Sequence, residues 1–431
     1  MSLAAQAQEV GEAGRFDWRG ATFVAVLLIA WITLRPFTDL GDAGALDLSS
    51  GRETATYVSF AILALLCLGQ VIGTDRQGLR CLAVPSFVGL SLWVGVSCIT
   101  SQDPATSLKR AALCGFAAAA AASLLLLPKG RLHLASLLGL AAGALLALSY
   151  CGVIFAPQYA IHQPTDLIEP NLAGNWRGVF AHKNDASAIF SMTAFLGVFV
   201  ARSGRMAAGC ALCAFSLLFV FLSDGKSSTI LCCAAFFISL MATRRGPPLL
   251  SAAIVIAPLL ALNALGLGSV AFPQFASIVA GLPLDATFTG RTEIWRFAME
   301  HVSSRMFLGH GFSAFWNSES VRSAAADAGS WAGQAAHAHN GYLDAALSMG
   351  LPGLALTLWA FVIQPFMDIR RATRLGADPA LVLTLAQIWL FGIYLSSLES
   401  FFFDRSNPIW ITFLFAVFGL RYLACYRAAS V

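Results

Sequence analysis

Charged residues are scarce in this chain. Only 12% of its 431 residues are Asp, Glu, Lys or Arg, whereas 58% are hydrophobic; a typical soluble domain carries about 25% charged residues. Too few polar side chains remain to cover a water-soluble globule of this length. The net charge is only +4, and no block of Lys and Arg suggests binding to nucleic acid. The composition therefore excludes a soluble protein and favours an integral membrane protein.

The sequence also lacks the common metal and nucleotide motifs. It has no H-E-x-x-H and no D-x-D, and His337 and His339 are two residues apart rather than the four of a helical zinc pair. The Gly-Lys-Ser sequence at 225–227 lacks the earlier glycine and the strand of a phosphate-binding loop. The ten cysteines lie in or beside apolar stretches, and none lies in the long polar segments. We therefore predict no metal, no cofactor and no disulfide-stapled loop.

Long apolar segments are abundant instead. A bilayer core needs about 20 apolar residues in each helix. The first segment lacks a clear small-residue cleavage site, so we expect a retained anchor. The sequence predicts a single all-α, polytopic membrane domain over residues 1–431, with about twelve transmembrane helices. We place these helices near residues 20–36, 54–73, 82–100, 110–127, 133–155, 184–201, 206–222, 228–243, 248–267, 339–366, 380–399 and 408–426.

The charges in the connections predict the orientation of these helices. With both termini in the cytoplasm, the inside segments hold 15 of the 27 basic residues and only 6 of the 23 acidic ones. Every inside connection then carries at least two Lys or Arg, as the positive-inside rule requires. We therefore expect a multi-pass protein of the cell inner membrane, with both termini cytoplasmic.

Two of the predicted outside segments are much longer than the inside connections. One covers residues 156–183, and the other covers residues 268–338, between the ninth and tenth helices. Long loops are uncommon unless they have a function, and binding and catalytic residues concentrate on them. We expect the chemistry of the protein to lie on this extracytoplasmic side, facing the periplasm.

Polar residues gather at the ends of these segments. Cations beside hydrocarbon usually face a cavity or a partner, and several cations on one face suit an anionic ligand such as a diphosphate. Taken alone, Arg177 and Lys183 also fit interfacial residues, and Arg291, where a helix is expected to start, also fits an ion pair with Glu293. We expect His310 to be a turn residue and His301 to be solvated. The candidate site residues are Arg177, His182, Lys183, Lys226, Arg291, His337, His339 and Asn340.

The motifs taken together are more specific than any one residue. They are Trp176-Arg-Gly-Val-Phe-Ala-His-Lys-Asn184, Gly290-Arg-Thr-Glu-Ile-Trp295, His339-Asn-Gly-Tyr-Leu343 and Gly350-Leu-Pro-Gly353. The combination resembles the O-antigen ligase/polymerase superfamily of membrane glycosyltransferases. With Leu222-Ser-Asp-Gly-Lys-Ser-Ser228 and Glu399-Ser400 it looks most like the exopolysaccharide polymerases of the succinoglycan type. Ligases often carry an arginine where this chain has Lys226.

The resemblance implies a function and roles for individual residues. The protein would transfer a glycan from a polyprenyl-diphosphate donor to a hydroxyl of a glycan or lipid-linked acceptor, without a metal and with inversion. His339 would be the general base, and Arg177 and Arg291 would hold the diphosphate. Weaker candidates are Lys183 and Lys226 for the diphosphate, with His337, His182 and Asn340 in secondary roles.

Several alternatives stay open at this point. The residues do not decide between polymerising repeat units, with a possible chain-length regulator as partner, and ligating a finished chain, as in lipopolysaccharide assembly. The main rival from another class is a secondary transporter or lipid-linked glycan flippase, which would also have twelve spans. A transporter is expected to place its charges at broken helices near the bilayer midplane, whereas here they gather on one face.

Overall fold

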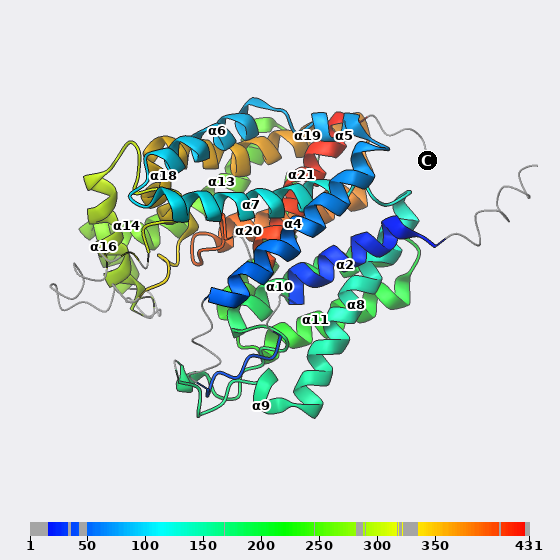
Figure 1. Cartoon of the computed structure of the whole chain (residues 1–431), viewed down its shortest axis with the longest axis horizontal. Coiled ribbons are helices and arrows are strands. Elements are labelled where there is room, and N and C mark those ends of the chain that lie inside the picture. The colour runs from blue at the N-terminus through cyan, green and yellow to red at the C-terminus, as the bar shows by residue number, and fades with distance from the viewer. Residues whose placement is uncertain are drawn as a thin grey trace, which may run out of the picture.

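The computed structural model shows an all-helical protein (Figure 1). It describes residues 16–32, 36–42, 50–167, 169–244, 246–281, 288, 290–316, 318, 321, 335–404 and 407–426. Within these residues no β-strand occurs, and one isolated antiparallel bridge joins Ile161 to Trp176. The predicted all-α fold class is confirmed.

The first half of the chain supplies eight longer helices and three short ones among the described residues. Each predicted apolar segment of this half coincides with one of the longer helices. The elements are α2 (Trp18–Ile32), α4 (Ser50–Ile72), α5 (Arg76–Arg80), α6 (Pro85–Ile99), α7 (Pro104–Leu124), α8 (Arg131–Phe155), α9 (Pro157–Ala160), the 3₁₀ helix η1 (Pro170–Leu172), α10 (Lys183–Arg202), α11 (Met206–Leu222) and α12 (Lys226–Ala242).

The second half contains the helix that carries the longest continuous apolar run. The segment predicted at 339–366 continues to residue 375, first as α18, then as a π-helical turn and then as α19. The predicted outside segment 268–338 is partly helical, because α14, α15 and α16 lie in it. The elements are α13 (Pro248–Leu265), α14 (Leu267–Ala271), α15 (Pro273–Ala280), α16 (Arg291–Ser304), α18 (Gly341–Leu358), η3 (Trp359–Ile363), α19 (Gln364–Leu375), α20 (Pro379–Leu395) and α21 (Pro408–Cys425).

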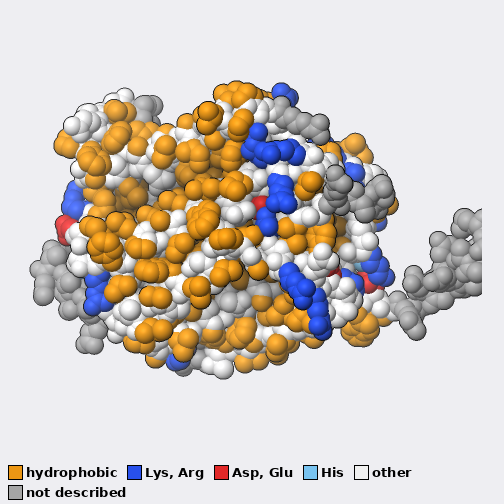
Figure 2. All heavy atoms as spheres, turned by 90° about the horizontal axis from the view of Figure 1, so that it is seen from above, with side chains coloured by type: hydrophobic (Ala, Val, Ile, Leu, Met, Phe, Trp, Pro, Cys, Tyr) orange, Lys and Arg blue, Asp and Glu red, His pale blue; other side chains and the backbone are white. Residues whose placement is uncertain are grey.

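The helices are apolar enough for a membrane. Within the described residues, six are long and apolar enough to cross a bilayer, and five shorter helices are also apolar. Helix α21 and helix α10 form the centre, with 83% and 78% of their apolar windows buried, whereas those of α4 and the α13–α14 segment are only 28% and 22% buried. The outer surface is largely hydrophobic, interrupted by groups of Lys and Arg (Figure 2). An apolar surface of this extent suits contact with lipid.

Polar connections gather at two opposite ends of the helices. Both ends of the described chain lie near α5 and α19, away from α9, α14 and α16 (Figure 1). The connections predicted to be inside contact one another, in the pairs Asp17–Lys129, Arg131–Asp378, Arg370–Gly246 and Arg421–Asp368. The connections predicted to be outside also contact one another, in the pairs Phe37–Val179 and Gln102–His310. The predicted outer ends of helices meet there as well, in the pairs Asn184–Glu399 and Asn263–Asn340. The described contacts therefore divide the connections into the same two groups that the charges in the sequence predicted.

Helix α18 is broken at Gly350, and a neighbouring loop fills the break. Gly350 has φ 68°, so the α-helical hydrogen bonds stop there. The backbone N–H of His310 donates to Leu347 O (2.8 Å), and that of Leu351 donates to Met306 O (2.8 Å). A Cβ on Gly309, which has φ 68°, would lie 2.6 Å from the backbone nitrogen of Gly350. Glycine is required at both positions, because only glycine allows this conformation and this approach.

Helix α16 packs on α18 through a small apolar cluster of its own. Trp295 is fully buried there, and its Nε1 donates to Ala338 O at 2.9 Å. The helix begins at Arg291, as the sequence predicted. The expectation for His301 is wrong. Its ring is half-buried, packs at a tilt against Phe297 with centroids 4.2 Å apart, and hydrogen-bonds Phe297 O through Nδ1, because this face of α16 turns toward the protein.

Candidate active site

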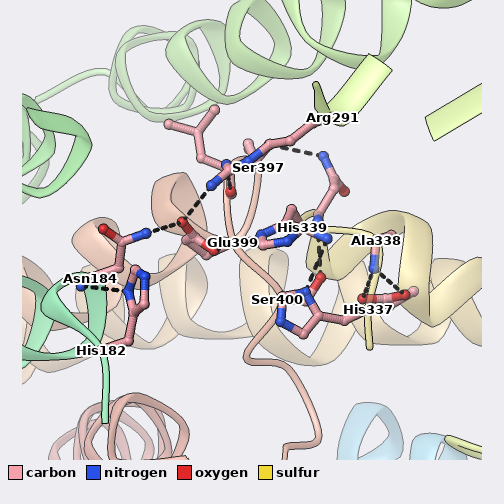
Figure 3. Close-up of polar contacts among 12 residues, drawn as sticks. His182, Asn184, Arg291, His337, Ala338, His339, Ser397, Glu399 and Ser400 are labelled. Atoms are coloured by element: carbon pink, nitrogen blue, oxygen red, sulfur yellow. Dashed lines mark hydrogen bonds and ion pairs between the residues drawn. The ribbon is translucent and has the colours of Figure 1, made fainter. Parts of the chain in front are cut away.

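Glu399 lies at the centre of the polar residues near one end of the molecule (Figure 3). It follows α20, in a segment that crosses between α10, α16 and α18. Its Oε1 accepts hydrogen bonds from Arg291 Nη2 at 2.8 Å and from Asn184 Nδ2 at 3.0 Å. Its Oε2 lies 3.2 Å from His339 Nδ1. Two expected site residues, Arg291 and His339, are thus brought together by a carboxylate.

The charge of Glu399 follows from these contacts. Burial by itself raises the pKa of this carboxyl, but the Arg291 guanidinium and the His339 hydrogen bond outweigh burial and lower the pKa to about 2. Glu399 is therefore ionised at any physiological pH. An ionised carboxylate only accepts hydrogen bonds, so the Nδ1 of His339 carries the proton that points to it. In the neutral ring the remaining nitrogen, Nε2, is then the acceptor, and no hydrogen bond from the described residues occupies it.

His339 is held in a strained backbone conformation. Its φ is 50°, in the left-handed region that non-glycine residues rarely adopt. Such a residue costs about 1–3 kcal/mol and persists only where its surroundings hold it. Here the next residue, Asn340, is anchored on both sides: its N–H donates to Ser400 Oγ at 2.9 Å, and its side-chain amide donates to Ser397 O at 3.0 Å. In this conformation the imidazole points toward Glu399 (Figure 3).

Asn340 has a structural role that its sequence neighbourhood explains. Its Oδ1 accepts from the N–H groups of Tyr342 (3.1 Å) and Leu343 (3.0 Å), so it caps the N-terminus of α18. The side chain is fully buried, and its amide also donates to Asn263 Oδ1 at 3.2 Å. Asn340 thus fixes the position of His339 relative to α18.

The two other expected histidines hold their protons differently. His182 caps α10, since its Nδ1 accepts from Asn184 N–H (3.0 Å), and its Nε2 lies 2.8 Å from Glu169 Oε2. Although burial opposes the charge, the hydrogen bond to Glu169 raises the pKa of His182, so Nε2 keeps its proton. The Nδ1 of His337 accepts from His339 N–H at 3.3 Å. Burial, followed by the neighbouring His339, lowers the pKa of His337, so it is neutral with its proton on Nε2.

The three histidines differ in which ring nitrogen carries the proton. They are assigned from the hydrogen bonds, because the bond at one ring nitrogen decides the role of the other. His182 and His337 both present an N–H at Nε2, whereas His339 presents a lone pair there. Of these three, His339 is the one whose hydrogen bond leaves Nε2 as the acceptor nitrogen of the neutral ring.

The two lysines lie where the short turn between α11 and α12 meets the start of α10. Lys183 Nζ donates to Asp224 O at 3.1 Å and lies 3.6 Å from Asp224 Oδ2. Lys226 is exposed at the first position of α12, where Gly225 provides no side-chain cap. The start of α10 packs closely on this turn, since a Cβ on Gly225 would lie 2.3 Å from Ser187 Oγ. Both cations are at the same end of the helices as Glu399.

Arg177 is placed differently from the expectation. Its side chain is fully buried, and the guanidinium donates to Phe180 O at 3.1 Å and to Thr38 O at 2.7 Å. Its side-chain hydrogen bonds in the described residues join the segments 36–42 and 177–180, and none of them is to Glu399, Arg291 or His339. Burial lowers the pKa of Arg177, with the nearby carboxylates of Asp166 and Asp39 acting in the opposite direction. The structure thus separates the two arginines that the sequence paired.

Two members of the site, Glu399 and Asn184, are not among the site residues predicted from the sequence. Both belong to quoted motifs, but an acid after one helix and an amide at the start of another carry no sign of contact across 215 residues of sequence. The useful signal for Glu399 was that it is an acid directly after an apolar helix. In the described part of the chain, no group of three or more His, Cys, Asp and Glu residues is suited to hold a metal ion.

Part of the chain matches a known family. Residues 211–358, from α11 through α18, match the family model described as O-antigen ligase. The matched region contains Lys226, Arg291 and His339, whereas Asn184 and Glu399 lie outside it. No curated protein matches the chain.

Proposed function

We propose a specific reaction for this protein. The O-antigen ligase match supports a place in the O-antigen ligase/polymerase superfamily, and with it glycan transfer of the ligase or polymerase type. The protein transfers a polyprenyl-diphosphate-linked glycan to a sugar hydroxyl of a glycan or lipid-linked acceptor, outside the cytoplasm. The transfer either polymerises exopolysaccharide repeat units or ligates a finished chain. One observation carries the proposal: Glu399 pairs with both Arg291 and His339 Nδ1, and no hydrogen bond from the described residues occupies His339 Nε2.

The base step follows from this arrangement. The acceptor oxygen forms a bond to the anomeric carbon while the bond from that carbon to the diphosphate oxygen breaks. The hydroxyl proton moves to His339 Nε2, and the positive imidazolium is stabilised by Glu399 at Nδ1. Direct displacement of this kind inverts the anomeric centre. No covalent intermediate is needed, and none of the contacts requires one.

Cations replace a metal at the leaving group. Arg291 lies at the first position of α16, and its N-cap Gly290 offers no capping side chain, so a cation and an uncapped helix N-terminus belong to the same turn. Lys226 begins α12 in the same way. Helix N-termini favour anions, and Arg binds phosphate oxygens through two parallel hydrogen bonds. We propose that Arg291 holds the diphosphate, with Lys183 and Lys226 as further cations, and that the reaction needs no metal.

The remaining expected residues have positioning roles. Arg177 fixes the segment that ends in His182 and Asn184, and Asn184 in turn holds Glu399. His337 and Asn340 hold the backbone on either side of His339. The polar residues gather at the ends of helices rather than midway along them, which favours transfer over transport.

Substitution of His339 tests the proposal. Positioned general-base catalysis contributes about 10²–10⁴-fold, so His339→Ala should lower turnover by that order while donor binding persists. The measurement is glycan product formed per minute by the purified full chain in detergent, with donor affinity measured alongside and EDTA present throughout. His133→Ala, at the opposite end in a pair with Asp17, is the matched control. If His339→Ala keeps more than about a tenth of normal turnover, the loss is smaller than base catalysis typically contributes, and the base assignment is excluded. Activity that returns only with added Mg²⁺ would exclude the metal-free mechanism.

A further inference from the structure

A basic pocket lies at the end of the helices opposite Glu399. Its volume is about 330 Å³, and it is formed by the end of α12, by Arg244 and Gly246 in the connection that follows, and by the last turns of α19. Helix α12 has 17 residues and begins at Lys226, so the pocket is about 25 Å from the catalytic end. The lining residues are Ala242, Arg244, Gly246, Arg370, Thr373 and Arg374. Three of the six are arginines and none is acidic.

One of these arginines is fixed in the pocket wall. Arg370 donates from Nη2 to Gly246 O at 3.0 Å and from Nη1 to Ser251 Oγ at 3.2 Å. Its Nε is buried and has no hydrogen-bond partner in the described residues. The acid nearest in sequence does not neutralise the pocket, because Asp368 pairs with Arg421 at 2.9 Å. The pocket therefore presents a preorganised and uncompensated positive charge.

Each wall continues from arginine into exposed apolar side chains. On α19 and the turn before it, Ile363, Met367, Arg370 and Arg374 are spaced i, i+4, i+7 and i+11, so they share one helical face. Ile363 and Met367 are exposed large hydrophobic residues. On α12, Phe237 and Met241 are exposed in the same way and lead to Arg244 by the same spacing. A cationic pocket at the end of two apolar stripes is complementary to a phospholipid. The phosphate would lie in the pocket, and the acyl chains would lie along the stripes.

The length of the helix supports this placement. The run from Gly341 to Leu375 has 35 residues, about 52 Å if straight, whereas a hydrocarbon core is about 30 Å thick. Its last turns therefore extend past the hydrocarbon into the headgroup layer. Basic pockets between helices at this depth bind anionic lipid headgroups.

We propose that this pocket binds the phosphodiester headgroup of an anionic phospholipid from the leaflet on the side of the chain termini. The three arginines hold the phosphate, and the acyl chains lie over the stripes of α12 and α19. The site is separate from the glycan-transfer chemistry and does not depend on it. A free inorganic phosphate offers the same oxygens but no acyl chains, so the two sources are distinguishable.

Native mass spectrometry of the delipidated full chain tests the proposal. The probes are dioleoylphosphatidylglycerol, dioleoylphosphatidylcholine and inorganic phosphate. The variant is the double substitution Arg244→Gln with Arg374→Gln, because both side chains are exposed and neither makes a hydrogen bond or ion pair with the described residues that the change would break. A cation near an anionic lipid contributes about a fivefold gain in affinity, so the double variant should bind phosphatidylglycerol about 25-fold more weakly.

The controls decide between outcomes. Arg205→Gln, exposed at the same end but outside the pocket, should bind phosphatidylglycerol as the unchanged protein does. The proposal fails if the double variant also binds it normally. It fails as well if phosphatidylcholine binds as tightly as phosphatidylglycerol, or if inorganic phosphate displaces the anionic lipid at equal concentration.

Discussion

Glu399→Gln separates catalysis from binding at the proposed site. Glutamine keeps the size of the side chain and an oxygen that accepts from His339 Nδ1, but it removes the charge that stabilises the imidazolium. The His339 and Glu399 side chains are 32% and 20% exposed and lie 3.2 Å apart. A hydrogen bond to a charged group in such a position is worth about 1.5–3 kcal/mol. The expected loss in kcat is therefore about 10- to 150-fold.

The same substitution should not weaken donor binding. Glu399 also pairs with Arg291 at 2.8 Å, so in the unchanged protein the carboxylate competes with the diphosphate for that guanidinium. Removing the negative charge should leave the donor KM unchanged or lower it while kcat falls. The assay is steady-state kinetics with purified lipid-linked donor. Glu293→Gln, exposed in the first turn of α16, is the matched control and should match the unchanged protein. A raised KM with normal kcat in Glu399→Gln would refute the reasoning, because Glu399 would then act in binding.

A pH titration of stability gives an independent check on the charge of Glu399. Its pKa in the folded protein, about 2, lies below the ordinary value of 4.5. The folded state therefore binds fewer protons, and the stability that the carboxylate contributes is complete above pH 4.5 and lost as the pH falls toward 2. Thermal unfolding of Glu399→Gln should lack this part of the acid dependence. Identical acid profiles for the two proteins would show that the carboxylate is not paired as the structure has it.

Two further predictions concern the arginines and the orientation. Arg177→Gln should lower the melting temperature, because the carbonyls of Phe180 and Thr38 lose a charged hydrogen-bond donor. Arg291→Gln should instead weaken binding of the glycan donor, with a smaller change in melting temperature. An Arg177→Gln protein that is as stable as the unchanged protein but binds the glycan donor weakly would show that Arg177 is a diphosphate ligand. A membrane-impermeant thiol reagent applied to intact cells should label Ser277→Cys, exposed in α15, and not Arg371→Cys, exposed in α19, relative to the unchanged protein; labelling at position 371 alone would reverse the topology.

The helices and their grouping at two ends could be predicted from the sequence because they depend on local properties. Apolar runs of this length predict helices, and successive helices place successive short connections at alternate ends of the molecule. The start of α16 at Arg291 was predictable for the same reason, since Gly290 and the periodic residues that follow are neighbours in sequence. The number of membrane crossings and the closer likeness to succinoglycan-type polymerases stay predictions.

The centre of the site was not predictable, because it depends on contacts between distant residues. Glu399 meets Asn184 and Arg291 across 215 and 108 residues of sequence. The inward direction of Arg177 depends on the carbonyl of Thr38, 139 residues away. A single sequence shows that a cation is present but not which way its side chain turns. His301 was misplaced for the same reason, since the aromatic residues that cover it include Phe315 from another segment.

The loop that fills the break in α18 closes a triangle. One side is α16, with 14 residues and a length of about 21 Å; another is the first half of α18, from Gly341 to the break, about 14 Å long. The loop that joins them at Gly309 and Gly350 is the shared vertex. Arg291 and His339 lie at the other two corners, where Glu399 joins them. The spacing between the proposed diphosphate ligand and the proposed base therefore depends on a loop contact at the far vertex as well as on Glu399.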